Sequence, residues 1–195
     1  MAGQTRDSTR PHNRRQLFRQ GFGKLLAPLA SFLEERLPVL VPRFYLRPPG
    51  ALPEKDFLDM CYRCGNCIDA CATNAIRRLS VGDPEADGTP YIDPDIVACA
   101  VCTTLECTAV CPSGALRRVT DKHEIHMGRA RVDTNLCFRG RQECTICVEN
   151  CPIGPDAIRI NDRGHVQVSE AGCIGCGRCR QVCPTYPRAI TIEPW

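Results

Sequence analysis

The sequence predicts an α+β fold built from four small repeated units, each a cysteine-rich loop with a short helix followed by short β-strands. Two features of the composition support this prediction. The 195-residue chain has an aromatic content of 6% and contains 16 Pro and 15 Gly, so one large hydrophobic core is not expected. It also contains 16 Cys, a density typical of folds that are stabilised by covalent cross-links or metal.

The repeat is defined by its cysteines, because every unit ends in Cys-x3-Cys. An apolar segment follows each unit, and a second β-prone segment precedes each of the last three units, so the linkers between units predict β-hairpins. The returning strands are predicted at residues 91–93, 130–133 and 166–168. The predicted domain covers residues 54–195, with units at 54–92, 93–132, 133–168 and 169–195.

Unit one has the spacing Cys61-x2-Cys64-x2-Cys67-x3-Cys71. Its short spacers bring three sulfurs around one point, which suits a cubane cluster, and the fourth cysteine of such a run ligates the neighbouring 4Fe-4S cluster. The sequence therefore predicts tandem bacterial-ferredoxin-like modules in which four 4Fe-4S clusters join the units in pairs. The predicted ligands are Cys61, Cys64, Cys67, Cys71, Cys99, Cys102, Cys107, Cys111, Cys137, Cys144, Cys147, Cys151, Cys173, Cys176, Cys179 and Cys183.

The later units change this spacing without losing a cysteine. Unit two is widened between Cys102 and Cys107, and unit three is widened between Cys137 and Cys144. A three-cysteine site with Cys137 free remains an alternative for unit three. Unit one has Ala72 where the other units have proline after the last cysteine. Glycines within the loops are predicted to take positive φ and to lie close to the clusters, and they are Gly65, Gly175 and Gly177.

Other interpretations of the cysteines are a disulfide scaffold and zinc sites. Cysteines in one tight loop cannot readily bridge each other without strain, and zinc ribbons lack the closing Cys-x3-Cys. The chain has no nucleotide, flavin or hydrolase motif. Four clusters would occupy every thiol and leave no open position for a substrate. We therefore expect an electron carrier with no small-molecule substrate of its own, not an enzyme.

Residues 1–53 are predicted to form a basic N-terminal arm. Nine Lys or Arg and three Asp or Glu lie among residues 1–47, which suits an anionic membrane surface or a partner protein; nucleic acid is not expected. Residues 17–37 predict an amphipathic helix, and the prolines of residues 38–53 predict an extended segment.

The N-terminal arm also contains a segment that bears on the cellular location of the protein. The segment Asn13–Arg19 is similar to a twin-arginine export signal, although a clean apolar region and cleavage site do not follow it. No apolar run is long enough for a transmembrane helix. We expect a cytoplasmic protein with peripheral contact to the membrane surface, and periplasmic location after twin-arginine export is the alternative.

The order of the four units, their two widened spacings and the lead-in Phe57–Gly65 resemble NapG and MauM, ferredoxin-type proteins of periplasmic nitrate reduction and methylamine utilisation that are related to NapF. The segment Cys111–Leu116 is also similar to the iron-sulfur subunits of molybdenum oxidoreductases. The resemblance implies electron transfer between a membrane-bound, quinol-linked partner and a terminal reductase or dehydrogenase, or alternatively an accessory role in maturing such an enzyme. The resemblance leaves the pairing of the units open. In one arrangement, unit one pairs with unit two and unit three with unit four. In the other, which the resemblance of unit two slightly favours, unit one pairs with unit four, and units two and three pair with each other between them.

Overall fold

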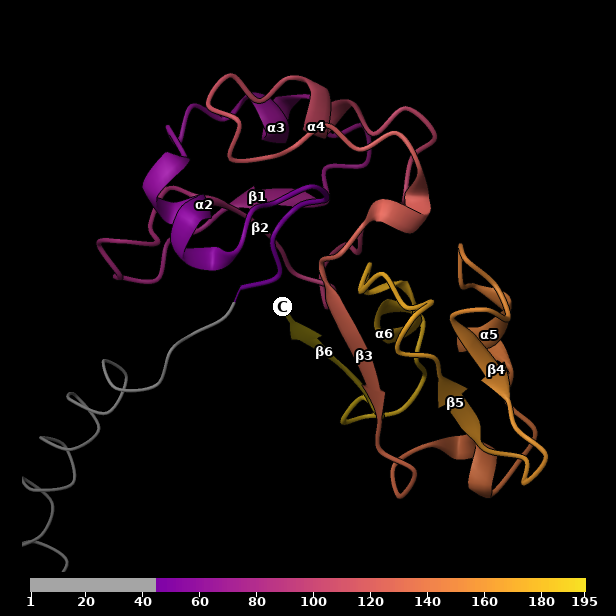
Figure 1. Ribbon diagram of the computed structural model, residues 1–195. Coiled ribbons are helices and arrows are strands. Elements are labelled where there is room, and N and C mark those ends of the chain that lie inside the picture. The colour runs from indigo at the N-terminus through magenta and orange to yellow at the C-terminus, as the bar shows by residue number, and fades with distance from the viewer. Residues whose placement is uncertain (1–44) are drawn as a thin grey trace, which may run out of the picture. The chain divides into compact units, whose positions relative to one another are not determined.

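The computed structural model describes residues 45–195, which lie in one compact unit, Phe44–Trp195. The amphipathic helix and the export-like segment predicted within residues 1–44 lie outside the described residues. No helix among residues 45–195 has the length and apolar character needed to span a bilayer. The described residues form two modules of similar construction, residues 45–120 and residues 125–195 (Figure 1).

The first module contains one hairpin and three helices. Strands β1 (Ile76–Arg78) and β2 (Pro90–Ile92) pair antiparallel, with Ile76 opposite Ile92. Helix α2 (Glu54–Met60) precedes unit one, and the single-turn helices α3 (Asn66–Asp69) and α4 (Glu106–Ala109) contact each other. An antiparallel bridge between Ala51 and Leu116 closes the module, because it joins the chain before unit one to the chain after unit two.

The second module repeats this construction. Strands β4 (Ile158–Ile160) and β5 (Val166–Val168) form its hairpin, and helices α5 (Ile146–Glu149) and α6 (Arg178–Gln181) contact each other. Strand β3 (Gly128–Val132) precedes unit three and pairs antiparallel with β6 (Ile190–Pro194), which follows unit four (Figure 1). Short 3-10 turns lie at η2 (Lys122–Glu124) and η3 (Phe138–Gly140).

The predicted hairpins are confirmed for two of the three linkers. The linker between units one and two forms β1–β2, and the linker between units three and four forms β4–β5. The hairpin predicted between units two and three is wrong. Its two halves pair elsewhere, Leu116 with Ala51 and β3 with β6, because each module is closed by its own first and last strands.

The segment before α2 packs against the first module, whereas the sequence predicted an extended arm up to residue 53. Four consecutive residues, Leu46, Arg47, Pro48 and Pro49, are buried. The backbone N–H of Ile92 donates to the carbonyl oxygen of Leu46 at 2.8 Å, which adds this segment to the edge of the β1–β2 hairpin. The compact unit therefore begins at Phe44, ten residues before the predicted boundary.

Two small clusters of buried side chains contain cysteines, and the larger of them takes residues from both modules. The larger cluster of buried side chains is centred on Phe57, Ile125 and Leu116 and includes Cys67, Cys99 and Cys176. The smaller cluster is centred on Ile158 and Ile190 and includes Cys147 and Cys183. With so few large apolar side chains, the thiols and whatever they bind make up much of each interior.

Candidate metal centres

The sixteen cysteines lie in the described residues, and all are free thiols. The alternative of a disulfide scaffold is therefore wrong. Four cysteines line each of four cavities, which we name sites A to D. Site A is lined by Cys61, Cys64, Cys67 and Cys111, and site B by Cys71, Cys99, Cys102 and Cys107. Site C is lined by Cys151, Cys173, Cys176 and Cys179, and site D by Cys137, Cys144, Cys147 and Cys183.

Each site takes three cysteines from one unit and the fourth from its partner unit. Cys71 of unit one lies in site B, and Cys111 of unit two lies in site A. Cys151 and Cys183 are exchanged between units three and four in the same way. The nested arrangement that the sequence slightly favoured is wrong. The first and last strands of each module pair with each other, which brings consecutive units together.

Tight left-handed turns wrap the backbone around the sulfurs. Gly65 (φ 91°) and Gly177 (φ 83°) lie at the starts of α3 and α6, and Gly175 has a φ of 72°. These values confirm the conformation predicted for the three glycines. Arg63 and Val101 also have positive φ, which the sequence did not reveal. Their backbone N–H groups donate to the Sγ atoms of Cys61 and Cys99 at 3.4 and 3.5 Å.

The widened spacings of units two and three are accommodated without moving a cysteine out of its cavity, and some of the extra residues line the cavities themselves: Thr104 and Leu105 line site B, and Phe138 lines site D. In unit three, the extra residues form η3 immediately after Cys137, and Cys137 still lines site D. In unit two, the extra residues lead into the buried Leu105, which starts α4 with a φ of 44°. The hypothesis of a free Cys137 is therefore not supported, since its thiol faces the same cavity as Cys144, Cys147 and Cys183.

The electrostatics of the sites suit a bound cation. Burial and, to a smaller extent, the neighbouring thiols of site A raise the pKa of Cys67 to about 11. Burial likewise raises the pKa of Cys99 in site B and of Cys176 in site C to about 12, and the pKa of Cys147 in site D to about 11. Four thiolates this close repel one another, so only bound cations would hold all four in the charged form. The donor set fits an iron-sulfur cluster.

The last cysteines of units one, two and four have a different environment. Although burial opposes it, hydrogen bonds lower the pKa of Cys71, Cys111 and Cys183, and a side-chain hydroxyl two residues later contributes to each. The hydroxyls belong to Thr73, Ser113 and Thr185. Unit three has Ile153 at this position. Sequence reasoning missed this difference, although the pattern Cys-x-Ser or Cys-x-Thr could have indicated it.

The four sites follow one another in the order A, B, C, D. The pKa of Cys107 in site B is raised by burial, by Cys71 and by Cys67 of site A, which places sites A and B side by side. The N–H of Cys99 in site B donates to the carbonyl oxygen of Cys176 in site C at 3.1 Å. Burial raises the pKa of Cys179 in site C, with a contribution from Cys147 of site D.

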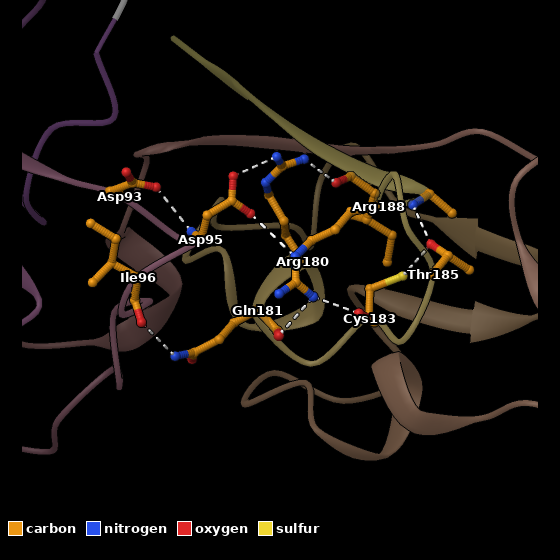
Figure 2. Close-up of polar contacts among 10 residues, drawn as sticks. Asp93, Asp95, Ile96, Arg180, Gln181, Cys183, Thr185 and Arg188 are labelled. Carbon is orange, nitrogen blue, oxygen red and sulfur yellow. Dashed lines mark hydrogen bonds and ion pairs between the residues drawn. The ribbon is translucent and has the colours of Figure 1, made fainter.

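A set of polar contacts joins the two modules near sites C and D (Figure 2). Asp95 forms ion pairs with Arg180 at 2.7 Å and with Arg188 at 3.2 Å. The side chain of Gln181 donates to the carbonyl oxygen of Ile96 at 3.4 Å. Asp95 and Ile96 belong to the first module, and their partners lie on or just after α6. Sequence reasoning missed this junction, because its partners are 85 residues apart.

The two outer sites lie beside exposed aromatic side chains. Tyr62, next to Cys61 of site A, is 72% exposed, and Cys64 of the same site is also exposed. Tyr186, three residues after Cys183 of site D, is 100% exposed. Exposed aromatic side chains therefore lie at both ends of the line of sites.

Comparison with known proteins agrees with this division into two modules. Family models described as "4Fe-4S dicluster domain" match residues 60–115 and 130–192, which contain units one and two and units three and four. These matches make the zinc interpretation wrong. They also bear out the tandem 4Fe-4S modules that the sequence predicted.

Several curated proteins are similar to the chain. Methylamine utilization ferredoxin-type protein MauM from Methylobacillus flagellatus is 39% identical over 159 residues, which cover 76% of this chain and 68% of that protein. Ferredoxin-type protein NapG from Escherichia coli is 34% identical over 163 residues, 76% of this chain and 70% of that protein. Ferredoxin-type protein NapF from Escherichia coli is 30% identical over 151 residues, which cover 76% of this chain and 84% of that protein.

Among solved structures, a chain of the formate dehydrogenase, heterodisulfide reductase and formylmethanofuran dehydrogenase complex of Methanospirillum hungatei is 23% identical, with a TM-score of 0.28. The match covers 71% of this chain and 51% of that chain. This likeness is too remote to bear on the fold.

Proposed function

The chain belongs to the family of ferredoxin-type iron-sulfur proteins that includes MauM and NapG, and we propose that it transfers electrons along sites A, B, C and D. In this proposal each site holds one 4Fe-4S cluster through its four thiolates. Such a cluster supplies the chemistry by accepting and returning a single electron. The chain's own residues hold the four sites in line and set the environment of the cysteine sulfurs. They also leave sites A and D, at the ends of the line, accessible to partner proteins.

The observation that carries the proposal is the contact between sites B and C. The hydrogen bond between Cys99 and Cys176 directly joins a cysteine of one module to a cysteine of the other. Within each module, one helical turn links the paired sites, since α3 carries Cys67 of site A and is followed by Cys71 of site B. A single helical turn rises only about 6 Å over four residues, so neighbouring sites are close throughout the line.

The proposed partners are two redox proteins, one at each end of the line. A membrane-bound, quinol-linked subunit would supply electrons, and a terminal reductase or dehydrogenase would receive them. The exposed Tyr62 and Tyr186 beside sites A and D support docking at both ends, because aromatic residues are enriched where proteins meet. The electron-carrier role requires no small-molecule substrate and no nucleic acid.

The proposed location is the cytoplasmic face of the membrane, reached through peripheral contacts of the basic residues within 1–43. Export through the twin-arginine route is the competing proposal. Fractionation of the tagged chain, with and without the double change Arg14→Lys and Arg15→Lys, separates the two. A periplasmic protein that becomes cytoplasmic in the double variant would favour export.

The test of the electron-transfer proposal has two steps. Purified protein should contain about sixteen iron and sixteen sulfide per chain, four of each per cluster. Membranes supplied with a quinol should then bleach its visible absorbance, and an added oxidised acceptor protein should restore it. Zinc in place of iron would contradict the cofactor assignment. Full iron content with no reduction by any membrane or soluble donor would instead favour the maturation role.

A further inference from the structure

The four sites differ in one contact to the last cysteine of each unit. The distance from Sγ to the hydroxyl oxygen two residues later is 3.2 Å for Cys183 in site D and 3.5 Å for Cys111 in site A. It lengthens to 3.8 Å for Cys71 in site B. In site C the equivalent residue after Cys151 is Ile153, which lines the cavity and has no hydroxyl. The contact therefore weakens in the order D, A, B and is missing at C.

The hydroxyl of Thr185 is oriented toward the sulfur in site D. Its oxygen accepts a hydrogen bond from the backbone N–H of Ala189 at 2.7 Å. Thr185 is buried, at 7% exposure, so the remaining hydroxyl hydrogen has Cys183 Sγ as its partner at 3.2 Å. The hydroxyl of Ser113 in site A is less firmly placed, because its contact to the N–H of Ala115 is 3.3 Å and the side chain is only half-buried.

Arginine side chains lie at three of the sites: Arg63 lines site A, the exposed Arg178 lines site C, and the half-buried Arg188 lies beside site D. The Arg188 guanidinium donates to the carbonyl oxygens of Cys183 and Gln181, which holds it at the end of α6 beside the site (Figure 2). Asp95 is shared between Arg188 and Arg180, so these three side chains together keep one net positive charge. Asp95 therefore offsets the charge of the two arginines only in part.

We infer that Thr185 and Arg188 give site D the highest reduction potential of the four sites, and that Ile153 leaves site C with the lowest. Reduction adds one negative charge to a cluster, and hydrogen bonds and cations that face its ligating sulfurs stabilise the reduced state. Electrons that enter the line at site A would therefore come to rest at site D, whereas site C would be the step of lowest potential. This inference rests on the proposed four-cluster relay.

The test is a redox titration of the iron-loaded full-length protein with dithionite as the one-electron donor, followed by EPR. Thr185→Val should lower the highest-potential step and leave the other three unchanged. We expect about a tenfold change in the reduction equilibrium, which is about 59 mV for a one-electron couple. Thr185→Ser keeps the hydroxyl and should restore the step. Arg188→Gln should lower the same step, whereas Arg188→Lys keeps the charge and should lower it less.

A matched pair of variants tests site C independently. Ile153→Thr introduces a hydroxyl where the other units have one and should raise the lowest-potential step by a similar amount. Ile153→Val has nearly the shape of threonine without the hydroxyl and should leave that step in place. Because these variants lie in a different site, they remain informative if Thr185→Val fails to load iron.

The outcomes separate this inference from the proposed function. Iron well below sixteen per chain in the unchanged protein would contradict the four-cluster proposal itself. Full iron loading, with Thr185→Val shifting a lower step or none, would overturn the assignment of site D. Full loading with equal effects of Ile153→Thr and Ile153→Val would overturn the assignment of site C.

Discussion

The backbone N–H of Cys99 donates a hydrogen bond to the carbonyl oxygen of Cys176, and the two atoms are 3.1 Å apart. Cys99 lines site B in the first module, and Cys176 lines site C in the second. The two modules thus meet at cysteines, as well as at the polar contacts of Asp95 and within the larger cluster of buried side chains. Whatever fixes this junction also fixes the separation of the two inner sites, on which electron transfer across the whole chain depends.

Asp95→Asn should loosen the junction. Asp95 pairs with Arg180 and Arg188 while keeping 47% of its side chain exposed, so we expect a loss of about 1 kcal/mol in stability at neutral pH. This corresponds to a decrease of about 2–4 °C in the midpoint of thermal cluster loss, measured by visible absorbance at a fixed scan rate. EPR should also show weaker coupling between the reduced inner clusters. Unchanged coupling and midpoint would contradict a role for Asp95 at the junction.

The effect of Asp95→Asn should depend on pH. The hydrogen bond from Arg180, aided by the charges of both arginines, lowers the pKa of Asp95 below its ordinary value of 3.8. A carboxylate with a lowered folded-state pKa stabilises the protein above its ordinary pKa, and this stabilisation is lost as the pH falls through the folded-state value. The difference between wild type and Asp95→Asn should therefore be constant near neutral pH and shrink below about pH 4.

Gly175→Ala should prevent the loading of site C. Gly175 has a φ of 72°, and an added Cβ would lie 2.4 Å from the backbone of Gly128 in β3. Neither backbone can give way without disturbing the β3–β6 pair, so we expect loss of iron from the second module. Gly164→Ala is the control, because Gly164 has a similar φ of 77° with open space around it. It should cost about 1–2 kcal/mol and retain all iron. Equal iron content in the two variants would refute this account.

The cysteine units were predictable from the sequence, because the ligands of one cluster are spaced by a few residues and this spacing is a local property. The contacts that join the units were not predictable from the sequence. The exchange of Cys71 and Cys111 depends on the bridge between Ala51 and Leu116, which are far apart in the chain. The prolines before α2 predicted an extended segment, and they did not reveal that this segment is buried against the module.

Arg47 explains why that segment packs. The sequence placed it in the basic N-terminal arm, whereas its side chain is buried and pairs with Glu54 at 2.5 Å. It also donates to the hydroxyl of Thr89 at 2.8 Å and lies over the ring of Phe57, 4.7 Å from the centroid. A long-range set of partners satisfies this buried charge, and such a set has no signature in local sequence.

Arg47→Met should therefore destabilise the first module far more than a surface substitution does. Removing one partner of a buried ion pair typically costs about 3–5 kcal/mol. Arg131→Met is the matched control, since Arg131 pairs with Glu193 at 2.8 Å while both side chains are at least half exposed. It should cost much less than Arg47→Met, because an ion pair between exposed side chains contributes little to stability. Rates of cluster loss in guanidinium chloride would compare the two. Similar rates would mean that the Arg47 pair contributes no more than a surface pair.

The exchange of cysteines between units can be tested by combining substitutions to alanine. Cys111 belongs to unit two in sequence but lines site A with Cys64 of unit one, whereas Cys107 of unit two lines site B. Cys111→Ala should damage one cluster, and adding Cys64→Ala should damage no other, because both thiols serve the same site. Adding Cys107→Ala to Cys111→Ala should damage a second cluster. Iron content and EPR spin quantification give the number of intact clusters. If the fourth cysteine instead served its own unit, the double variant of Cys107 and Cys111 would lose only one cluster, and the double variant of Cys64 and Cys111 would lose two. That result would disprove the exchange.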